Sequence, residues 1–252
     1  AGGCGLWKPF LRLRGGRNPW SFFGGWNVQP VPASPQFAGA SPGDNGPPDL
    51  AQALMRPSST RPLLVIASGN AYKVAEISTM LDAVDLEVCR QPEGLEIEET
   101  GSTYLENARL KATEVARLTG QWSLADDSGL EVDALGGAPG LYSARYAPTD
   151  HERIHRLLRE LGSTPYRSAS FNSAMVLADP EGQVLLEAQG ICRGEILTAP
   201  EGHGGGYDPI FWVREAGMTY AQMGQHLKDK LGSRGKAARA LAPGLKQLLG
   251  LR

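Results

Sequence analysis

The sequence predicts an α/β fold with a mixed β-sheet and flanking helices. Three observations support this prediction: short apolar runs rich in β-branched residues, amphipathic helical patterns between them, and one long alternating segment typical of a β-hairpin. The chain has 252 residues, and 41% of them are hydrophobic. That length and composition are typical of one globular domain with an extension.

Residues 1–60 differ from the remainder of the chain in composition. They are rich in Gly, Pro, Trp and Phe and show no sustained helical or strand period. Their early charges are basic, which would suit a targeting peptide, but they lack the apolar core of a secretory signal. We therefore expect 1–60 to be a disordered extension and 61–252 to be the folded domain. Met55, shortly before this domain, could be the true start of translation.

The first half of the domain contains two expected strands and two expected helices. Residues 63–68 form an apolar run typical of a buried strand, and residues 70–83 carry apolar side chains at helical intervals. A second helix is expected to begin at Thr103, because residues 103–106 have the S/T-x-x-E pattern of a capping box. Residues 122–125 form a further strand, which we expect to end at two aspartates.

The second half begins with a hairpin and ends with a helix. Residues 168–178 and 183–196 alternate between apolar and polar side chains on either side of an Asp-Pro-Glu-Gly turn. Residues 234–249 place apolar side chains on one helical face. The antiparallel pair, beside strands that alternate with helices, indicates a mixed sheet.

Charge and cysteine content argue against several classes of protein. The chain has 25 Lys and Arg against 27 Asp and Glu, without a basic stripe for a nucleic-acid polymer. No apolar run approaches the roughly 18 residues of a membrane span. The three cysteines are widely spaced and odd in number. We interpret them as reduced thiols of a cytoplasmic protein, in preference to a disulfide or a zinc site.

A turn that could bind phosphate follows the first expected strand. Gly69 permits a tight turn between Ser68 and Asn70, and the helix that starts there offers free backbone N–H groups. Lys73 lies in the first turn of that helix, where its ammonium could reach a phosphate. The pattern differs from a P-loop. Taken alone, it is explained more simply by a capped helix with a surface lysine.

Two acidic pairs suggest a metal site. Each pair is followed by a hydroxyl residue and a glycine, and the pairs are Glu98-Glu99 and Asp126-Asp127. Carboxylates gathered at the end of a strand repel one another unless a cation neutralises them. Magnesium is bound by one or two carboxylates and keeps other positions for water and phosphate. Ordinary loop acids that cap helices are the alternative.

Further polar and cationic residues lie in a helix and in glycine-rich loops. Asn107 and Lys111 share one face of the second helix, where they could bind phosphate or be solvated. The loop segments could equally be structural turns, and none of them specifies a reaction alone. The candidate residues in these segments and in the Asp-Asp-Ser-Gly motif are Ser128, Arg145, Gly206, Tyr207, Asp208, Lys228, Ser233 and Arg234.

Read together, these segments resemble the inosine triphosphatase family. The matching stretches are SGNAYK at 68–73, EETGSTYLENARLKA at 98–112, ADDSGLEVDALGGAPGLYSARYA at 125–147, GGYDPIF at 205–211 and KDKLGSRGKA at 228–237. The resemblance implies an elongated mixed sheet with two lobes and an active-site cleft between them. It also implies a homodimer that hydrolyses non-standard purine triphosphates (ITP, dITP or XTP) to the monophosphate and pyrophosphate with Mg²⁺.

The resemblance also implies roles for the candidate residues. Glu99 and Asp127 would hold the metal, and Asp127 would act as general base. Asn70 and Lys73 would bind the triphosphate, and Ser128 would touch the nucleotide. Lys228 and Arg234 would face the base or its neighbouring phosphate. The other expected substrate-binding residues are Ser68, Gly69, Asn107, Lys111, Arg145, Gly206, Tyr207, Asp208 and Ser233.

Two departures from the family pattern affect base recognition. The family usually has Phe before Gly-Tyr-Asp, where this chain has Gly205 or a deletion. It usually has Ser-His-Arg where this chain has Gly232, Ser233 and Arg234. We therefore expect weaker nucleotide binding or weaker base discrimination than in relatives, unless another aromatic residue such as Tyr207 or Trp212 fills the gap. The alternative functions are a nucleotide-binding module without catalysis and a pyrophosphatase for another modified nucleotide.

Overall fold

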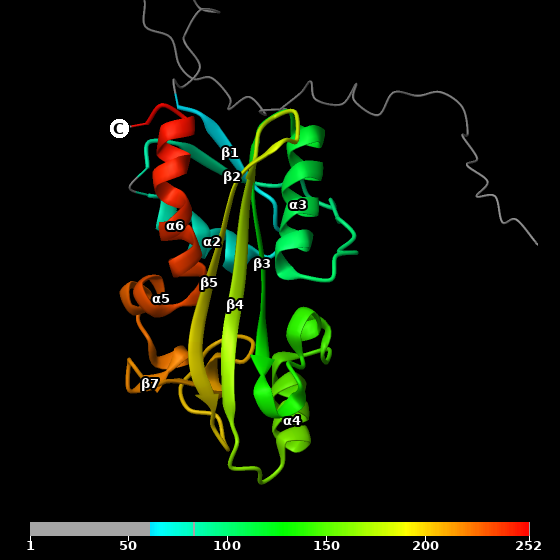
Figure 1. The fold of residues 1–252 in the computed structure, drawn as a ribbon, viewed down its shortest axis with the longest axis vertical. Coiled ribbons are helices and arrows are strands. Elements are labelled where there is room, and N and C mark those ends of the chain that lie inside the picture. Colours follow the sequence, from blue (N-terminus) through cyan, green and yellow to red (C-terminus); the bar gives the residue numbers. More distant parts are fainter. Residues whose placement is uncertain (1–60, 83, 252) are drawn as a thin grey trace, which may run out of the picture. The chain divides into compact units, whose positions relative to one another are not determined.

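The computed structural model describes residues 61–82 and 84–251, and Figure 1 shows their arrangement. The expectation of a disordered extension over residues 1–60 lies outside the described residues. Within the described part, helices flank a sheet with the strand order β2-β1-β3-β4-β5-β6-β7. The α/β prediction is therefore confirmed.

The described strands and helices have the following bounds. The strands are β1 (Leu63–Ile66), β2 (Glu87–Arg90), β3 (Trp122–Val132), β4 (Ser168–Ala178), β5 (Val184–Ile196), β6 (Phe211–Val213) and β7 (Met218–Thr219). The α-helices are α2 (Ala71–Leu81), α3 (Tyr104–Thr119), α4 (Asp150–Leu161), α5 (Gln225–Leu231) and α6 (Ser233–Leu248). Short 3₁₀ helices are η1 (Asp133–Leu135), η2 (Gly140–Arg145), η3 (Asp208–Ile210) and η4 (Tyr220–Gln222).

The sheet is mixed, as predicted. β1 runs parallel to both β2 and β3, whereas β3 to β7 pair in an antiparallel manner. The expected hairpin is the pair β4 and β5, which stay in register from Ser168↔Glu195 to Leu177↔Leu186. β3, β4 and β5 are the longest strands, and Figure 1 shows them running between two groups of helices.

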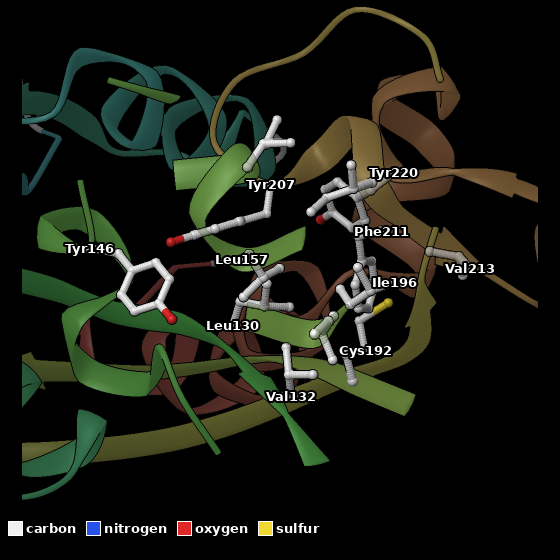
Figure 2. Close-up of a cluster of buried hydrophobic side chains, with 14 of the residues drawn as sticks. Leu130, Val132, Tyr146, Leu157, Cys192, Ile196, Tyr207, Phe211, Val213 and Tyr220 are labelled. Carbon is white, nitrogen blue, oxygen red and sulfur yellow. The ribbon is translucent and has the colours of Figure 1, made fainter. Parts of the chain in front are cut away.

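Three apolar cores cover the sheet. At one end, α2 and α6 pack on one face through Ile77 and Leu241, and α3 packs on the other face through Val115. Side chains alternate along β1, so Leu64 joins the first core and Val65 the second. The third core lies at the other end of the long strands, between α4, β5 and β6, and Figure 2 shows its side chains.

The helix starts agree with the capping residues. The Asn70 side chain accepts hydrogen bonds from the first turn of α2, and the Thr103 hydroxyl accepts one from the Glu106 N–H. The predicted capping box differs in one contact, because the Glu106 carboxylate returns to the Ser102 N–H at 2.7 Å. Both caps satisfy backbone donors that the helix itself leaves unpaired.

The structure corrects the expected end of β3. The aspartates do not terminate this strand, which continues to Val132. Pairing with β1 stops at Leu124, but pairing with β4 continues to Val132↔Ala169. The sequence pattern also missed four short or highly charged elements, namely β2, α4, α5 and β7. Among the described residues, no helix has both the length and the apolar surface needed to cross a bilayer.

The packing of α6 on β5 requires a residue without a side chain at position 190. A Cβ atom on Gly190 would overlap the Ser233 carbonyl oxygen and stand 2.7 Å from the Ala237 nitrogen. Gly190→Ala is expected to lower the free energy of unfolding by about 1–3 kcal/mol, as overpacking does, and the melting temperature by several degrees. Gly224→Ala is the matched control, since a Cβ there meets nothing within 4 Å. Equal melting temperatures for the two variants would contradict this account of the packing.

Candidate active site

The candidate site opens where β1 leaves the sheet. β1 ends at Ile66, and the Ala67 N–H still donates to the Leu124 carbonyl at 2.9 Å. Beyond this point β3 pairs with β4 on one side and no longer pairs with β1 on the other. Because side chains alternate along a strand, Asp126 points to the face of α2 and α6, and Asp127 points to the face of α3.

The Asp127 carboxylate belongs to a cluster on the α3 face. The Lys111 ammonium lies 3.0 Å from Asp127 Oδ1, 2.9 Å from Glu99 Oε1 and 2.9 Å from the Asp126 carbonyl oxygen. Asn107 is buried and donates to Asp127 Oδ2 at 3.2 Å. Arg145 Nη1 lies 3.1 Å from the second oxygen of Glu99. One lysine therefore bridges the two carboxylates that were expected to hold a metal.

The Asp126 carboxylate belongs to a second cluster on the opposite face. Its Oδ2 atom lies 3.0 Å from Lys73 Nζ and 3.3 Å from Arg234 Nη2. The Ser128 hydroxyl donates to the same oxygen at 3.2 Å and accepts from Arg234 Nη2 at 3.0 Å. Arg234 also pairs with Glu76 of α2. This cluster connects α2, β3 and α6.

The ion pairs fix the charge states of both clusters. Burial alone would raise the pKa of Asp126, but Arg234 and Lys73 hold it well below its usual range. Burial also opposes ionisation of Glu99, yet Lys111 and Arg145 lower its pKa. Desolvation would lower the pKa of Lys111, whereas the nearby carboxylates raise it, so that its amine stays charged. The site therefore holds compensated charges at neutral pH.

A cavity of about 260 Å³ lies beside these clusters. Ten of the expected site residues line it, namely Lys73, Glu99, Asp127, Ser128, Arg145, Gly206, Tyr207, Asp208, Ser233 and Arg234. The Gly206 N–H donates to Asp150 Oδ2 at 2.7 Å, and the Tyr207 hydroxyl donates to the Ser143 carbonyl at 2.9 Å. These bonds attach the glycine-rich loop to α4 and to η2.

The other expected residues stand behind the cavity wall. Asn107 and Lys111 reach it through Asp127, and Lys228 Nζ lies 3.1 Å from Asp208 Oδ2. The turn at 68–70 lies outside the cavity lining, and its Asn70 side chain accepts the Tyr72 N–H at 2.9 Å. Ser68, Gly69 and Asn70 thus shape the start of α2 in this structure.

Sequence reasoning missed the aromatic wall. Phe171 of β4 and Tyr220 of η4 line the cavity, and their ring centroids are 5.4 Å apart. Of the two rings named as possible substitutes for the missing Phe, Tyr207 lines the cavity, whereas Trp212 does not. Figure 2 shows Tyr207 and Tyr220 at one side of the third core. These rings come together only through tertiary structure, so local sequence patterns carry no signal for them.

Ser233 has a partner that the sequence did not reveal. Its hydroxyl lies 2.8 Å from the Ser173 hydroxyl of β4, and both residues line the cavity. Ser233 is 5% exposed. The Ser233 hydroxyl is therefore already hydrogen-bonded within the protein. The neighbouring Arg234 guanidinium has more N–H donors than this hydroxyl.

The donors of the Asp127 cluster fit a hard cation. Among the described residues no group of three or more His, Cys, Asp and Glu is arranged to hold a metal ion. Glu99 and Asp127 nevertheless converge on one point, which the Lys111 ammonium occupies. Two carboxylates are sufficient for magnesium, whose other positions are filled by water and phosphate.

The Asp126 cluster should make stability depend on pH at the acid end. In the folded state, burial would raise the pKa of the Asp126 carboxyl group, but Arg234 and Lys73 lower it below the roughly 3.9 of an unfolded aspartate. A lowered pKa adds stability above the unfolded value, and that stability is lost as the pH falls through the folded value. The difference in unfolding free energy between wild type and Asp126→Asn should therefore be largest near neutral pH and shrink below a pH of about 4.

Denaturant unfolding at several pH values measures this difference. Asp82→Asn provides a control, because Asp82 is exposed at the end of α2. A difference for Asp126→Asn that stays constant from neutral to acid pH would contradict the assignment.

Comparisons with known proteins place the chain among its relatives. It is 53% identical over 188 residues to a dITP/XTP pyrophosphatase of Nostoc sp., covering 74% of this chain and 96% of the relative. It is 55% identical over 187 residues to a dITP/XTP pyrophosphatase of Parasynechococcus marenigrum, covering 74% and 96%.

Solved structures agree with these sequence relatives. The structure of a HAM1 protein from Coxiella burnetii matches with a TM-score of 0.68 at 40% identity, covering 74% of this chain and 99% of that one. The Staphylococcus aureus Ham1 protein matches with a TM-score of 0.66 at 38% identity, covering 73% and 98%. A sequence model of the Ham1 family matches residues 64–244, and the chain therefore belongs to the Ham1 family.

Proposed function

We propose that this protein hydrolyses non-standard purine nucleoside triphosphates, such as ITP, dITP and XTP, to the monophosphate and pyrophosphate. The observation that supports this best is the pair of carboxylates, Glu99 and Asp127, bridged by Lys111 beside a cavity lined with further cations. A triphosphate needs such cations, and its hydrolysis needs a carboxylate near the attacked phosphorus. Relatives with more than 50% identity bear the name dITP/XTP pyrophosphatase.

Glu99 and Asp127 would hold a magnesium ion. When bound, the ion would draw charge from the phosphate oxygens and favour in-line attack. Lys111 would then turn from bridging the carboxylates to pairing with a phosphate oxygen. Arg145 lies against Glu99 and would neutralise charge at the same end of the cavity.

Asp127 would act as the general base. A carboxylate close to a water molecule can accept its proton at neutral pH. The Asn107 amide donates to Asp127 Oδ2 and fixes the orientation of the carboxylate, which leaves Oδ1 towards Lys111. Lys73 lines the cavity and would stabilise the phosphates of the leaving group.

The purine base would lie at the aromatic end of the cavity. Phe171 and Tyr220 offer ring surfaces there, and Arg234 offers N–H donors to an oxo group. A purine with an oxo group at C6 accepts such bonds, whereas the adenine amino group would face another donor. Leaving a buried polar group unpaired is what makes rejection strong.

We further propose that the protein works as a homodimer in the cytoplasm. The family resemblance implies the dimer. The described cysteines, Cys89 and Cys192, are both free thiols, which is consistent with a reducing compartment.

A panel of triphosphates tests the proposed reaction. With Mg²⁺, ITP and XTP should give one monophosphate and one pyrophosphate per turnover. Asp127→Asn should lower kcat by roughly 10²–10⁴ while keeping the fold, since it removes the base and one metal charge. Product analysis and circular dichroism measure both effects, with the exposed Asp82→Asn as control. Release of orthophosphate, or more than about a tenth of the wild-type rate in Asp127→Asn, would contradict the proposal.

A conservative change at Arg234 tests base recognition. Arg234→Lys keeps the charge but loses the planar fork that can donate two bonds. The ratio of kcat/KM for ITP to that for ATP is expected to fall at least about tenfold, which is the weight of one charged hydrogen bond. Arg239→Lys on the same helix is the matched control, because Arg239 is exposed and bonds the Lys230 carbonyl. A ratio that stays constant in Arg234→Lys would show that other groups read the base.

A further inference from the structure

Helix α4 carries a pair of histidines outside the candidate active site. His151 and His155 are four residues apart and both are exposed. Their Nε2 atoms are 3.0 Å apart, with ring centroids at 4.2 Å and an interplanar angle of 58°. Neither residue lines the cavity that holds Asp127. The pyrophosphatase chemistry proposed above leaves this pair without a role.

The separation of the two nitrogens matches the bite of a metal chelate. A zinc ion lies about 2.0–2.1 Å from each imidazole nitrogen. Two such ligands at an angle of roughly 90–110° are then about 2.9–3.4 Å apart, by the geometry of that triangle. The observed 3.0 Å falls within this range. The pair could therefore bind one ion without movement of the helix backbone.

The helix holds the two rings in place. Thr149 and Glu152 form a capping box at its start, and Ile154, Leu157 and Leu161 bury its inner face. Side chains four residues apart lie above one another on a helix. Little conformational freedom of the backbone is thus lost when an ion binds, which favours chelation.

We propose that His151 and His155 form a bidentate site for a transition-metal ion such as Ni²⁺, Cu²⁺ or Zn²⁺, with water in the remaining positions. Imidazole suits these ions, whereas the carboxylates of the candidate active site suit a hard ion such as Mg²⁺. Both Nε2 atoms must be unprotonated to bind. The ring that now donates its Nε2 proton would carry that proton on Nδ1 instead, so neither histidine has to lose a proton overall.

The charged neighbours do not supply a third ligand. The Glu152 carboxylate is bonded to Thr149, and the Arg156 guanidinium is bonded to Glu160. Arg159, one turn beyond His155, adds a positive charge to that side of the helix. The affinity should therefore come from the two imidazoles and fall when either is removed.

Calorimetric titration of the untagged full-length protein with NiCl₂, in excess Mg²⁺ near pH 7.5, tests the site. The wild type is expected to bind one Ni²⁺ ion, with the affinity lowered at least about tenfold in His151→Ala, in His155→Ala and in the double variant. Alanine is favourable in an exposed helical position, so these variants should fold. The chain has four histidines, which leaves His203→Ala and His226→Ala as matched controls that should bind as the wild type does.

The pH supplies a second test of the same site. Binding should weaken as the pH is lowered, because protons compete with the metal ion for the imidazole nitrogens. The proposal is overturned if the double variant binds Ni²⁺ as tightly as the wild type, or if the wild type shows no binding that the double variant lacks. It is equally overturned if His203→Ala or His226→Ala abolishes the binding. None of these results depends on pyrophosphatase activity, so the two proposals fail independently.

Discussion

The structure depends on how the two neighbouring carboxylates of β3 are neutralised. Asp126 and Asp127 lie inside the long strand and point to opposite faces of the sheet. A buried charge without a partner is costly, so each needs cations from the helices on its own face. Lys73 and Arg234 meet the first carboxylate, and Lys111 meets the second. The same contacts that dock α2, α3 and α6 on the sheet also build the polar end of the cavity.

This arrangement places charged and aromatic groups around a single cavity. The charged lining residues come from both faces of the sheet, and the rings of Phe171 and Tyr220 stand among the other lining residues. A nucleoside triphosphate has the same division between a charged chain and an aromatic base. The loop that carries Tyr207 is tied down by hydrogen bonds to Asp150 and to the Ser143 carbonyl, so this part of the wall is held in a defined position. The two histidines of α4 are exposed and lie outside this cavity.

Local sequence patterns were enough for part of the fold and of the site. Asn70 and Thr103 begin helices because their side chains satisfy nearby backbone donors, which is a local effect. The end of β3 could not be found in this way, since its continuation depends on pairing with β4 some 40 residues later. The bond between Ser173 and Ser233 and the wall formed by Phe171 and Tyr220 are likewise long-range contacts. A strand as short as β7, with two residues, shows no periodicity at all.

Glu99 and Asp127 are proposed to form a cation site that serves a bound triphosphate. Its most direct test is calorimetric binding of a non-hydrolysable α,β-methylene ITP with and without Mg²⁺, in the wild type, in Glu99→Gln and in Glu98→Gln. Glu98 is the exposed neighbour of Glu99 and provides the matched control. Mg²⁺ should tighten binding at least about tenfold, since it neutralises phosphate charge, and only Glu99→Gln should abolish this gain. Binding that ignores Mg²⁺, or an equal loss in both variants, would contradict this proposal.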